Sequence, residues 1–282
     1  MRAFLSREED EVTQNILHRN NIKIFGKGTQ PMIFAHGFGC DQRFWRFVAP
    51  AFENEYKIVL FDHVGSGMSD RQEYDSERYS SLTGYAQDVI DICKTLELTD
   101  VIFVGHSVSS MIGILASIQE PGIFSRLVFI GASPSYLNDP PDYIGGFEQA
   151  DIDGLLDMME KNYIGWAGYL APVAMKNADR PELAYELETS FTSTNHAIMC
   201  QFASVTFYSD FRDDLPKMST PSLILQPSED AFVPLHVAEY LHHQLTHSTL
   251  MWMQATGHFP HLSSPDETIQ MIKAYLPAVH IT

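Results

Sequence analysis

The chain has 282 residues, of which 45% are hydrophobic and 19% charged, so it can bury one large core with an added insertion. Its formal net charge of −18 argues against nucleic acid and anionic membrane surfaces as partners, because both attract Lys and Arg. No apolar run approaches the ~20 residues of a membrane-spanning helix. The opening residues also lack the apolar middle of a signal peptide, and we therefore expect a cytoplasmic protein.

Strand and helix patterns alternate from about residue 16 to residue 134, after an acidic extension at residues 1–15. Short apolar runs predict strands at 16–25, 31–37, 56–62, 101–104 and 126–133. Helical spacing of apolar residues predicts helices at 43–52, 82–96 and 111–118. This alternation is typical of a mostly parallel sheet with helices on both faces.

The pattern changes between residues 135 and 215, where no strand is evident and helical periodicity recurs at 154–175, 181–193 and 196–209. We interpret this stretch as an inserted helical subdomain. Strand and helix alternation then resumes from 216 to 282, so the predicted α/β core consists of residues 16–134 and 216–282.

The stretch VGHSVSS at residues 104–110 follows a buried strand and opens a helix, which is the setting of a nucleophilic serine in one class of hydrolases. The chain must reverse within about two residues, and this forces the residue at the tip toward a positive φ. Gly105 supplies a small neighbour at that turn. We therefore expect Ser107 to be a nucleophile.

Ser109 stands where the usual motif has a second glycine. We interpret it as a packing substitute, since serine adds only a hydroxymethyl group between the helix and its neighbouring strand. An alternative stays open, in which the Ser109 hydroxyl bonds a catalytic residue or a ligand.

A serine hydroxyl needs an imidazole to remove its proton and a carboxylate to orient that imidazole. Asp230 follows one apolar strand and His258 follows the next, in the order expected for such a set. Gly257 gives the backbone freedom to turn the imidazole inward. The neighbouring Glu229 is a rival acid, and His261 is a rival base.

Attack on a carbonyl also requires N–H donors for the oxyanion that forms. The turn HGFG at residues 36–39 directly follows a strand, and its glycines let a backbone N–H face the site. We expect the N–H groups of Phe38 and Val108 to form this oxyanion hole. A second glycine-containing turn at 62–70 lacks a phosphate-binding lysine, so we interpret it as structural.

These features resemble the α/β-hydrolase superfamily from about residue 16 to the end. The stretches GFGCDQRFW, YLNDPPDY and HFPHLSSPDETIQ are similar to the RsbQ-like subfamily, bacterial stress-response hydrolases related to plant karrikin and strigolactone receptors. The resemblance implies a mostly parallel sheet, a four-helix lid at 135–215 and a small apolar pocket. It also implies a catalytic triad of Ser107, Asp230 and His258, no cofactor, and a PAS-domain phosphatase as signalling partner.

The predicted lid holds more aromatic residues than so small a subdomain needs for its own core. We expect five aromatic residues to line an apolar pocket above the nucleophile, namely Tyr136, Phe147, Trp166, Phe202 and Phe207.

We do not expect the remaining histidine and cysteine groups to bind a metal ion or form disulfides. His242, His243 and His247 lie on an amphipathic helix without a nearby carboxylate pattern, so we interpret them as solvated rather than metal-binding. The three cysteines are widely spaced, which is typical of buried free thiols.

Two classes of function follow. The protein is either a turnover enzyme for small esters or lactones, or a regulator that binds or slowly converts one small hydrophobic molecule and acts through a protein partner. Haloalkane dehalogenases and epoxide hydrolases of this fold use aspartate at the elbow, so Ser107 argues against both. The predicted triad does not distinguish the protein from hydroxynitrile lyases and perhydrolases, so these two classes stay open as alternatives.

Overall fold

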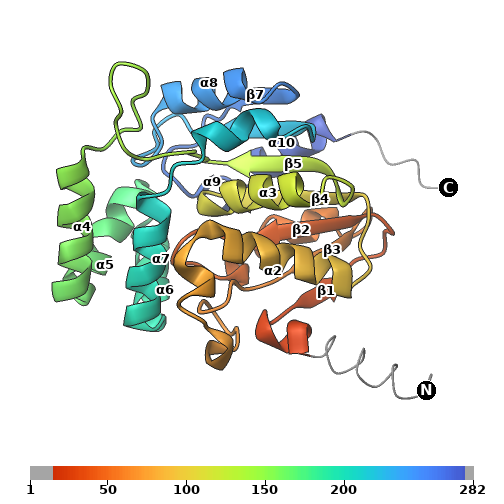
Figure 1. Ribbon diagram of the computed structural model, residues 1–282, viewed down its shortest axis with the longest axis horizontal. Coiled ribbons are helices and arrows are strands. Elements are labelled where there is room, and N and C mark those ends of the chain that lie inside the picture. The colour runs from red at the N-terminus through yellow and green to blue at the C-terminus, as the bar shows by residue number, and fades with distance from the viewer. Residues whose placement is uncertain (1–14, 277–282) are drawn as a thin grey trace.

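The computed structural model describes residues 15–276, and the predicted acidic extension falls outside them except for Asn15. Seven strands form one sheet in the order β1-β3-β2-β4-β5-β6-β7 (Figure 1). Only the β1–β3 pair is antiparallel. The strands are β1 (Lys23–Phe25), β2 (Pro31–Ala35), β3 (Lys57–Leu60), β4 (Val101–His106), β5 (Phe124–Ile130), β6 (Ser222–Gln226) and β7 (Ser248–Trp252).

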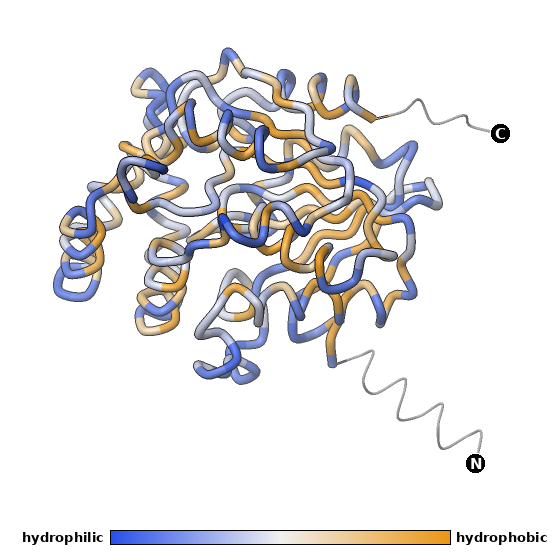
Figure 2. Tube along the Cα trace, turned by 45° about the horizontal axis from the view of Figure 1, so that its top comes forward, coloured by the Kyte–Doolittle hydropathy of each residue, from blue (hydrophilic) through white to orange (hydrophobic). Residues whose placement is uncertain are grey.

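Helices cover both faces of this sheet, because successive residues of its buried strands point to opposite sides. Phe103 of β4 packs with α2 (Leu82–Thr95), α3 (Val108–Gln119) and α8 (Leu235–Gln244) on one face. Its neighbour Val104 packs on the other face with α10 (Pro265–Tyr275). Figure 2 shows the hydrophobic stretches concentrated along the central strands.

Four α-helices stand between β5 and β6, namely α4 (Gln149–Lys161), α5 (Tyr163–Met175), α6 (Pro181–Ser193) and α7 (His196–Phe207). They lie together at one side of the sheet (Figure 1). Other short helices are η3 (Arg71–Glu73), η4 (Arg78–Ser80), η5 (Arg212–Lys217) and α9 (Pro260–Ser263). No helix within residues 15–276 is both long and apolar enough to cross a lipid bilayer.

The strand predicted at 16–25 is wrong in its first half, where residues 15–19 are helical. Asn21 then adopts a left-handed φ of 46°, which ends this turn and redirects the chain into β1. The buried Asn20 side chain donates to the Asp62 carbonyl oxygen at 3.1 Å and fixes the turn against the sheet.

The helix predicted at 43–52 is also corrected, since this segment forms two 3₁₀-helices, η1 (Gln42–Trp45) and η2 (Ala49–Phe52). Pro50 has no N–H to donate to the carbonyl four residues earlier, so a continuous α-helix is disfavoured. The apolar side chains keep their helical spacing and still pack into the core, where Trp45 and Phe52 are fully buried.

Candidate active site

Ser107 occupies the sharp turn between β4 and α3. Its backbone has a φ of 54° and a ψ of −121°, a strained conformation that presents the side chain at the tip of the turn. Gly105 is required here, because a Cβ at that position would lie 2.7 Å from the Ser109 carbonyl oxygen. The strand, the turn and the helix therefore form where the sequence predicts them.

A chain of hydrogen bonds joins Ser107, His258 and Asp230. His258 Nε2 lies 2.8 Å from Ser107 Oγ, and His258 Nδ1 lies 2.7 Å from Asp230 Oδ2. The second carboxylate oxygen of Asp230 accepts the backbone N–H groups of Phe232 and Val233. The ionised Asp230 carboxylate can only accept a hydrogen bond, so His258 Nδ1 carries the imidazole proton. The other ring nitrogen, Nε2, is left to accept a hydrogen bond from the Ser107 hydroxyl.

Glycines and a buried histidine hold the imidazole of His258 in place. A Cβ at Gly131 would lie 3.2 Å from both Asp230 Oδ2 and the His258 ring, so only glycine leaves room for their contact. Gly257 has a φ of +84°, which provides the turn that the sequence predicts. The His106 ring donates from Nε2 to the His258 carbonyl oxygen at 2.8 Å and so fixes the backbone of that residue.

The structure separates both rivals from this site. The Glu229 side chain is 63% exposed and forms an ion pair with Lys176, whereas the Asp230 side chain is fully buried. His261 is buried and stacks on Trp45 with ring centroids 4.6 Å apart. Burial lowers the pKa of His261 to about 3, so its ring stays neutral.

A second serine–histidine pair lies nearby, with His63 Nε2 2.7 Å from Ser109 Oγ. The Ser109 hydroxyl donates to the His36 carbonyl oxygen at 2.5 Å, so it receives its other bond from the His63 N–H. The His63 Nδ1 atom has no partner among the described residues, and no carboxylate orients the ring. The pair therefore lacks the acid of a triad, and the Ser109 hydroxyl is fully buried.

This arrangement corrects the interpretation of Ser109 as a packing substitute for glycine. Its hydroxyl makes two hydrogen bonds that the sequence gives no means of foreseeing, because the partners lie 46 and 73 positions away. It bonds neither Ser107, Asp230 nor His258, so the alternative of a bond to a catalytic residue is wrong, while a bond to a ligand stays untested.

The loop after β2 brings Phe38 into the wall of the pocket beside Ser107. Within residues 15–276, the backbone N–H groups of Phe38 and Val108 donate to no other protein group. The Phe38 N–H shares its peptide group with the Gly37 carbonyl. This carbonyl oxygen accepts hydrogen bonds from the Cys40 N–H and from the His36 Nδ1–H. Both N–H groups therefore have no protein acceptor in that range, and their role as an oxyanion hole stays a prediction.

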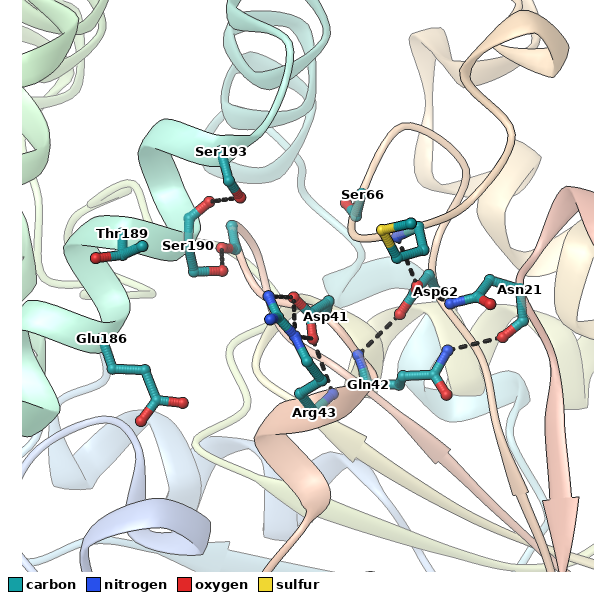
Figure 3. A network of polar contacts seen from close by, with 12 residues as sticks. Asn21, Asp41, Gln42, Arg43, Asp62, Ser66, Glu186, Thr189, Ser190 and Ser193 are labelled. Atoms are coloured by element: carbon teal, nitrogen blue, oxygen red, sulfur yellow. Dashed lines mark hydrogen bonds and ion pairs between the residues drawn. The ribbon is translucent and has the colours of Figure 1, made fainter.

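Polar contacts hold the far end of this loop (Figure 3). The Asp62 carboxylate accepts the Gln42 backbone N–H at 2.9 Å, and it also accepts from Asn21 and the Met68 backbone. The turn at 62–70, interpreted as structural from the sequence, thus supports the loop. In the same view, Ser190 of α6 reaches the loop from the inserted helices.

A small apolar pocket with a cavity volume of about 30 Å³ lies above Ser107. Two of the five predicted aromatic residues, Tyr136 and Phe207, line it. The Tyr136 hydroxyl lies 3.4 Å from Ser107 Oγ, and burial raises its pKa, so the hydroxyl keeps its proton. The rest of the wall is formed by Phe38, His106, Leu170, Ala174, Phe191, Thr206, Phe232, His258 and Phe259.

The prediction that Phe147, Trp166 and Phe202 line the pocket is corrected. Phe202 stacks on Tyr85 at a centroid distance of 4.6 Å, and Trp166 stacks on Tyr163 at 5.6 Å. Phe147 stacks behind Phe232 at 6.4 Å. All three support the wall from behind, and helical spacing alone does not distinguish these two layers.

Of the residues weighed for metal binding or disulfide formation, Cys40 lies beside this site, with its Sγ atom 3.5 Å from the Phe38 carbonyl oxygen. His242 is exposed and its Nδ1 atom lies 2.8 Å from the Ser248 hydroxyl. Cys40 and Cys93 are buried, Cys200 is half-buried, and burial raises the pKa of all three thiols. In the part of the chain that the structure describes, no three His, Cys, Asp or Glu side chains form a group suited to a metal ion.

The fold and this site define the class of the protein. Residues 32–271 match the model of the alpha/beta hydrolase family, and the chain therefore belongs to that family. The predicted α/β-hydrolase fold, a mostly parallel sheet flanked by helices, is confirmed.

Particular relatives are named as a receptor, an esterase and a hydrolase. The chain is 41% identical to the Karrikin insensitive 2 receptor CA of Petunia hybrida over 258 residues, which cover 91% of this chain and 95% of that protein. It is 38% identical to the Strigolactone esterase D14 of Arabidopsis thaliana over 264 residues, covering 93% and 98%. The solved structure of a hydrolase from Oleispira antarctica superposes with a TM-score of 0.91 and 42% identity, covering 93% of this chain and 96% of that one.

Proposed function

We propose that the protein is a serine hydrolase that cleaves small apolar esters or lactones. The observation that carries this proposal is the hydrogen-bonded series from Ser107 through His258 to Asp230, at the base of an apolar pocket. That series satisfies the requirement for an activated nucleophile and an oriented base. The relationship to esterase-named proteins supports the same class of reaction.

In the proposed reaction, Ser107 Oγ attacks the carbonyl carbon while His258 Nε2 takes the hydroxyl proton. The Asp230 carboxylate stabilises the resulting imidazolium without taking its proton. The N–H groups of Phe38 and Val108 donate to the carbonyl oxygen, which becomes an oxyanion. His258 then protonates the departing alkoxide, which leaves an acyl group on Ser107.

Water completes the cycle through the same residues. His258 removes a proton from water, the hydroxide attacks the acyl carbon, and the bond to Ser107 breaks as the serine oxygen regains its proton. In a lactone the alcohol stays attached to the acyl group, and ring opening yields one hydroxy acid.

The pocket supports a small substrate. Its cavity volume of about 30 Å³ is far below the ~300–1,000 Å³ of ligand pockets in general, so side chains of the wall would have to move apart even for a small substrate. Its wall is almost entirely aromatic and aliphatic, so burial of apolar groups supplies most of the affinity. We propose that helices α4–α7 act as a lid, because Leu170, Phe191 and Phe207 contribute to the wall from α5, α6 and α7.

Steady-state kinetics on short acyl esters and lactones test the proposal. We expect turnover that falls by a factor of at least about 10³ in S107A, since removing any triad member leaves only binding and the oxyanion hole. Turnover that is equal in wild type and S107A would contradict the assignment of Ser107.

A regulator is the second candidate, because one relative is named a receptor and another an esterase. In this form the same residues bind or slowly convert one small hydrophobic molecule and pass the signal to a protein partner. The RsbQ-like resemblance implies a PAS-domain phosphatase as that partner. Both this partner and the cytoplasmic location stay predictions.

A pull-down from the native host, made beside the kinetics, distinguishes the two candidates. Fast steady-state turnover without a partner supports the enzyme. A single slow burst of product, together with a protein retained only in the presence of ligand, supports the regulator.

A further inference from the structure

We propose that two buried serines outside the triad, Ser109 of α3 and Ser190 of α6, are positioning residues that aim the Phe38 N–H at the oxyanion. The proposal rests on the proposed hydrolase function and on two hydrogen bonds that fix the loop on either side of Phe38. One bond comes from the α/β core and the other from the inserted helices.

Ser109 fixes the loop before Phe38. Its hydroxyl donates to the His36 carbonyl oxygen at 2.5 Å and accepts the His63 Nε2–H at 2.7 Å. The hydroxyl has one proton, and a carbonyl only accepts, so the direction of both bonds is determined. Because Ser109 follows Val108 directly, the same helical turn carries one donor of the oxyanion hole and holds the loop of the other.

Ser190 fixes the loop after Phe38. Its side chain is buried and its hydroxyl donates to the Gly39 carbonyl oxygen at 2.7 Å (Figure 3). Gly39 has a φ of +71°, and a Cβ there would lie 2.3 Å from the Phe191 ring, so α6 packs directly on this turn. Arg46 and Glu186 join the same helix to the core through a bidentate ion pair at 2.7 Å.

The peptide planes explain how these bonds act on Phe38. The Phe38 N–H belongs to the peptide whose carbonyl is that of Gly37. Ser109 holds the His36 carbonyl, which belongs to the peptide before that one. Ser190 holds the Gly39 carbonyl, which belongs to the second peptide after it. A peptide unit is planar, so fixing its neighbours limits the rotation that would turn the N–H away from the site. An oxyanion hole depends on such fixed donors.

S109A and S190A test the proposal, and each helix offers a matched control. Ser117 is a buried serine of α3 whose hydroxyl donates to the Ile114 carbonyl at 2.8 Å, within its own helix. Ser193 of α6 donates to the Ser190 carbonyl at 2.8 Å. S117A and S193A therefore remove the same hydroxyl from the same helices without releasing the loop.

We expect kcat to fall about tenfold in S109A and in S190A, while KM changes less than about threefold. Removing a whole oxyanion donor costs about 10²–10³ in kcat, and a loosened donor costs less. S117A and S193A should keep kcat within about twofold of wild type. Thermal midpoints, measured in parallel, show whether any loss follows from unfolding.

A transition-state analogue supplies a readout that a merely structural role would not change. A short alkylboronic acid forms a tetrahedral adduct through a bond between boron and Ser107 Oγ, with one boron-bound oxygen at the oxyanion hole. Its Kd should rise in S109A and S190A by about the same factor as kcat/KM falls. The Kd of the matching N-methyl amide, a planar ground-state analogue, should stay within about threefold.

Each outcome bears on one hypothesis. Unchanged kcat and boronate Kd in both variants would overturn the proposal, and a loss in only one variant would overturn the role of the other serine. Equal weakening of boronate and amide would indicate a damaged pocket and also overturn it. If wild type turns over no ester or lactone, the proposed function is contradicted, and the boronate comparison still tests both serines.

Discussion

His258 Nε2 and Ser107 Oγ lie 2.8 Å apart although 151 positions separate them in the chain. They meet because β4, β6 and β7 run parallel, so the loops that follow them open at the same edge of the sheet. Asp230 follows β6 and completes the series from that edge. The sheet topology therefore brings together residues that no local sequence pattern connects.

Replacing Asp230 with Asn should leave the fold intact and lower ester turnover by about 10⁴, as the loss of a triad carboxylate does in serine proteases. The Asn oxygen can still accept the Phe232 and Val233 N–H groups that Oδ1 accepts now. Its NH₂ group would then face His258 Nδ1 and favour the tautomer that cannot accept the serine proton. Steady-state kinetics and circular dichroism measure the two effects.

Glu229 provides the matched control for that substitution. Its side chain is exposed and pairs with Lys176, so E229Q should change turnover less than about twofold. A large loss in E229Q with little loss in D230N would mean that Glu229 is the acid.

Phenylmethanesulfonyl fluoride should label Ser107 alone among the three serines of the turn. Ser109 and Ser110 are fully buried, and their hydroxyls donate to the carbonyls of His36 and Gly105. Of the three, only Ser107 lines the pocket, where its hydroxyl faces the imidazole of His258. Intact mass and peptide mapping would locate the adduct, and H258N should slow its formation. An adduct on Ser109 would contradict the assignment.

Phe207 and Phe202 should respond differently to truncation, although both are buried on α7. Phe207 lines the pocket, so F207A should raise kcat/KM for longer acyl chains relative to short ones. Phe202 stacks on Tyr85 behind the wall, so F202A should cost about 3–5 kcal/mol of stability with an unchanged acyl preference. The same preference in all three proteins would show that Phe207 does not limit substrate length.

Three buried histidines should make the fold sensitive to acid. Burial lowers the pKa of His63, His106 and His261, in the last case to about 3. In the unfolded chain each has a pKa of about 6.5, so below that pH the unfolded state takes up protons that the native state lacks. The free energy of unfolding should be highest above pH about 6.5 and should fall as the pH decreases below it, with His261 contributing about 1.4 kcal/mol per pH unit down to its folded-state pKa of about 3.

Urea unfolding of H261L between pH 7 and 4 isolates one of these contributions. The pH slope should decrease by about 1.4 kcal/mol per pH unit, because Leu takes up no proton in either state. His243 is exposed on α8, and H243Q is the matched control. An identical slope in wild type and H261L would show that His261 does not remain neutral in the native state.

The sequence predicted a mostly parallel sheet with helices on both faces because its buried strands and amphipathic helices carry strong, local periodicities, whereas the α/β-hydrolase fold was implied by the family resemblance. It also led to Ser107, Asp230 and His258, since each follows a strand that the pattern marks clearly, and the structure brings all three together. Their catalytic roles stay a proposal. The errors fall where one residue overrides a pattern, as Pro50 does at the predicted helix 43–52.

Other features depend on contacts that no local pattern contains. The hydroxyl of Ser109 gains its partners only when β2 and β3 lie against α3, so its role could not be predicted from the turn itself. The pocket wall poses the same problem. Phe191 and Phe232 line it while Trp166 supports it from behind, and only the packed arrangement of helices decides between these positions.

The insertion between β5 and β6 also divides the candidate site along the chain. Residues 139–142 are exposed in the loop that leads from β5 to α4 (Figure 1). A cut there would leave Ser107 and Phe38 on one fragment, and Ser190, Asp230 and His258 on the other. Neither fragment alone holds both the proposed nucleophile and its proposed base, so the proposed esterase activity would appear only when β5 and β6 pair again across the cut. The protein thus offers a ready break point for a two-fragment complementation reporter, in which product formation measures the association of two fused partners.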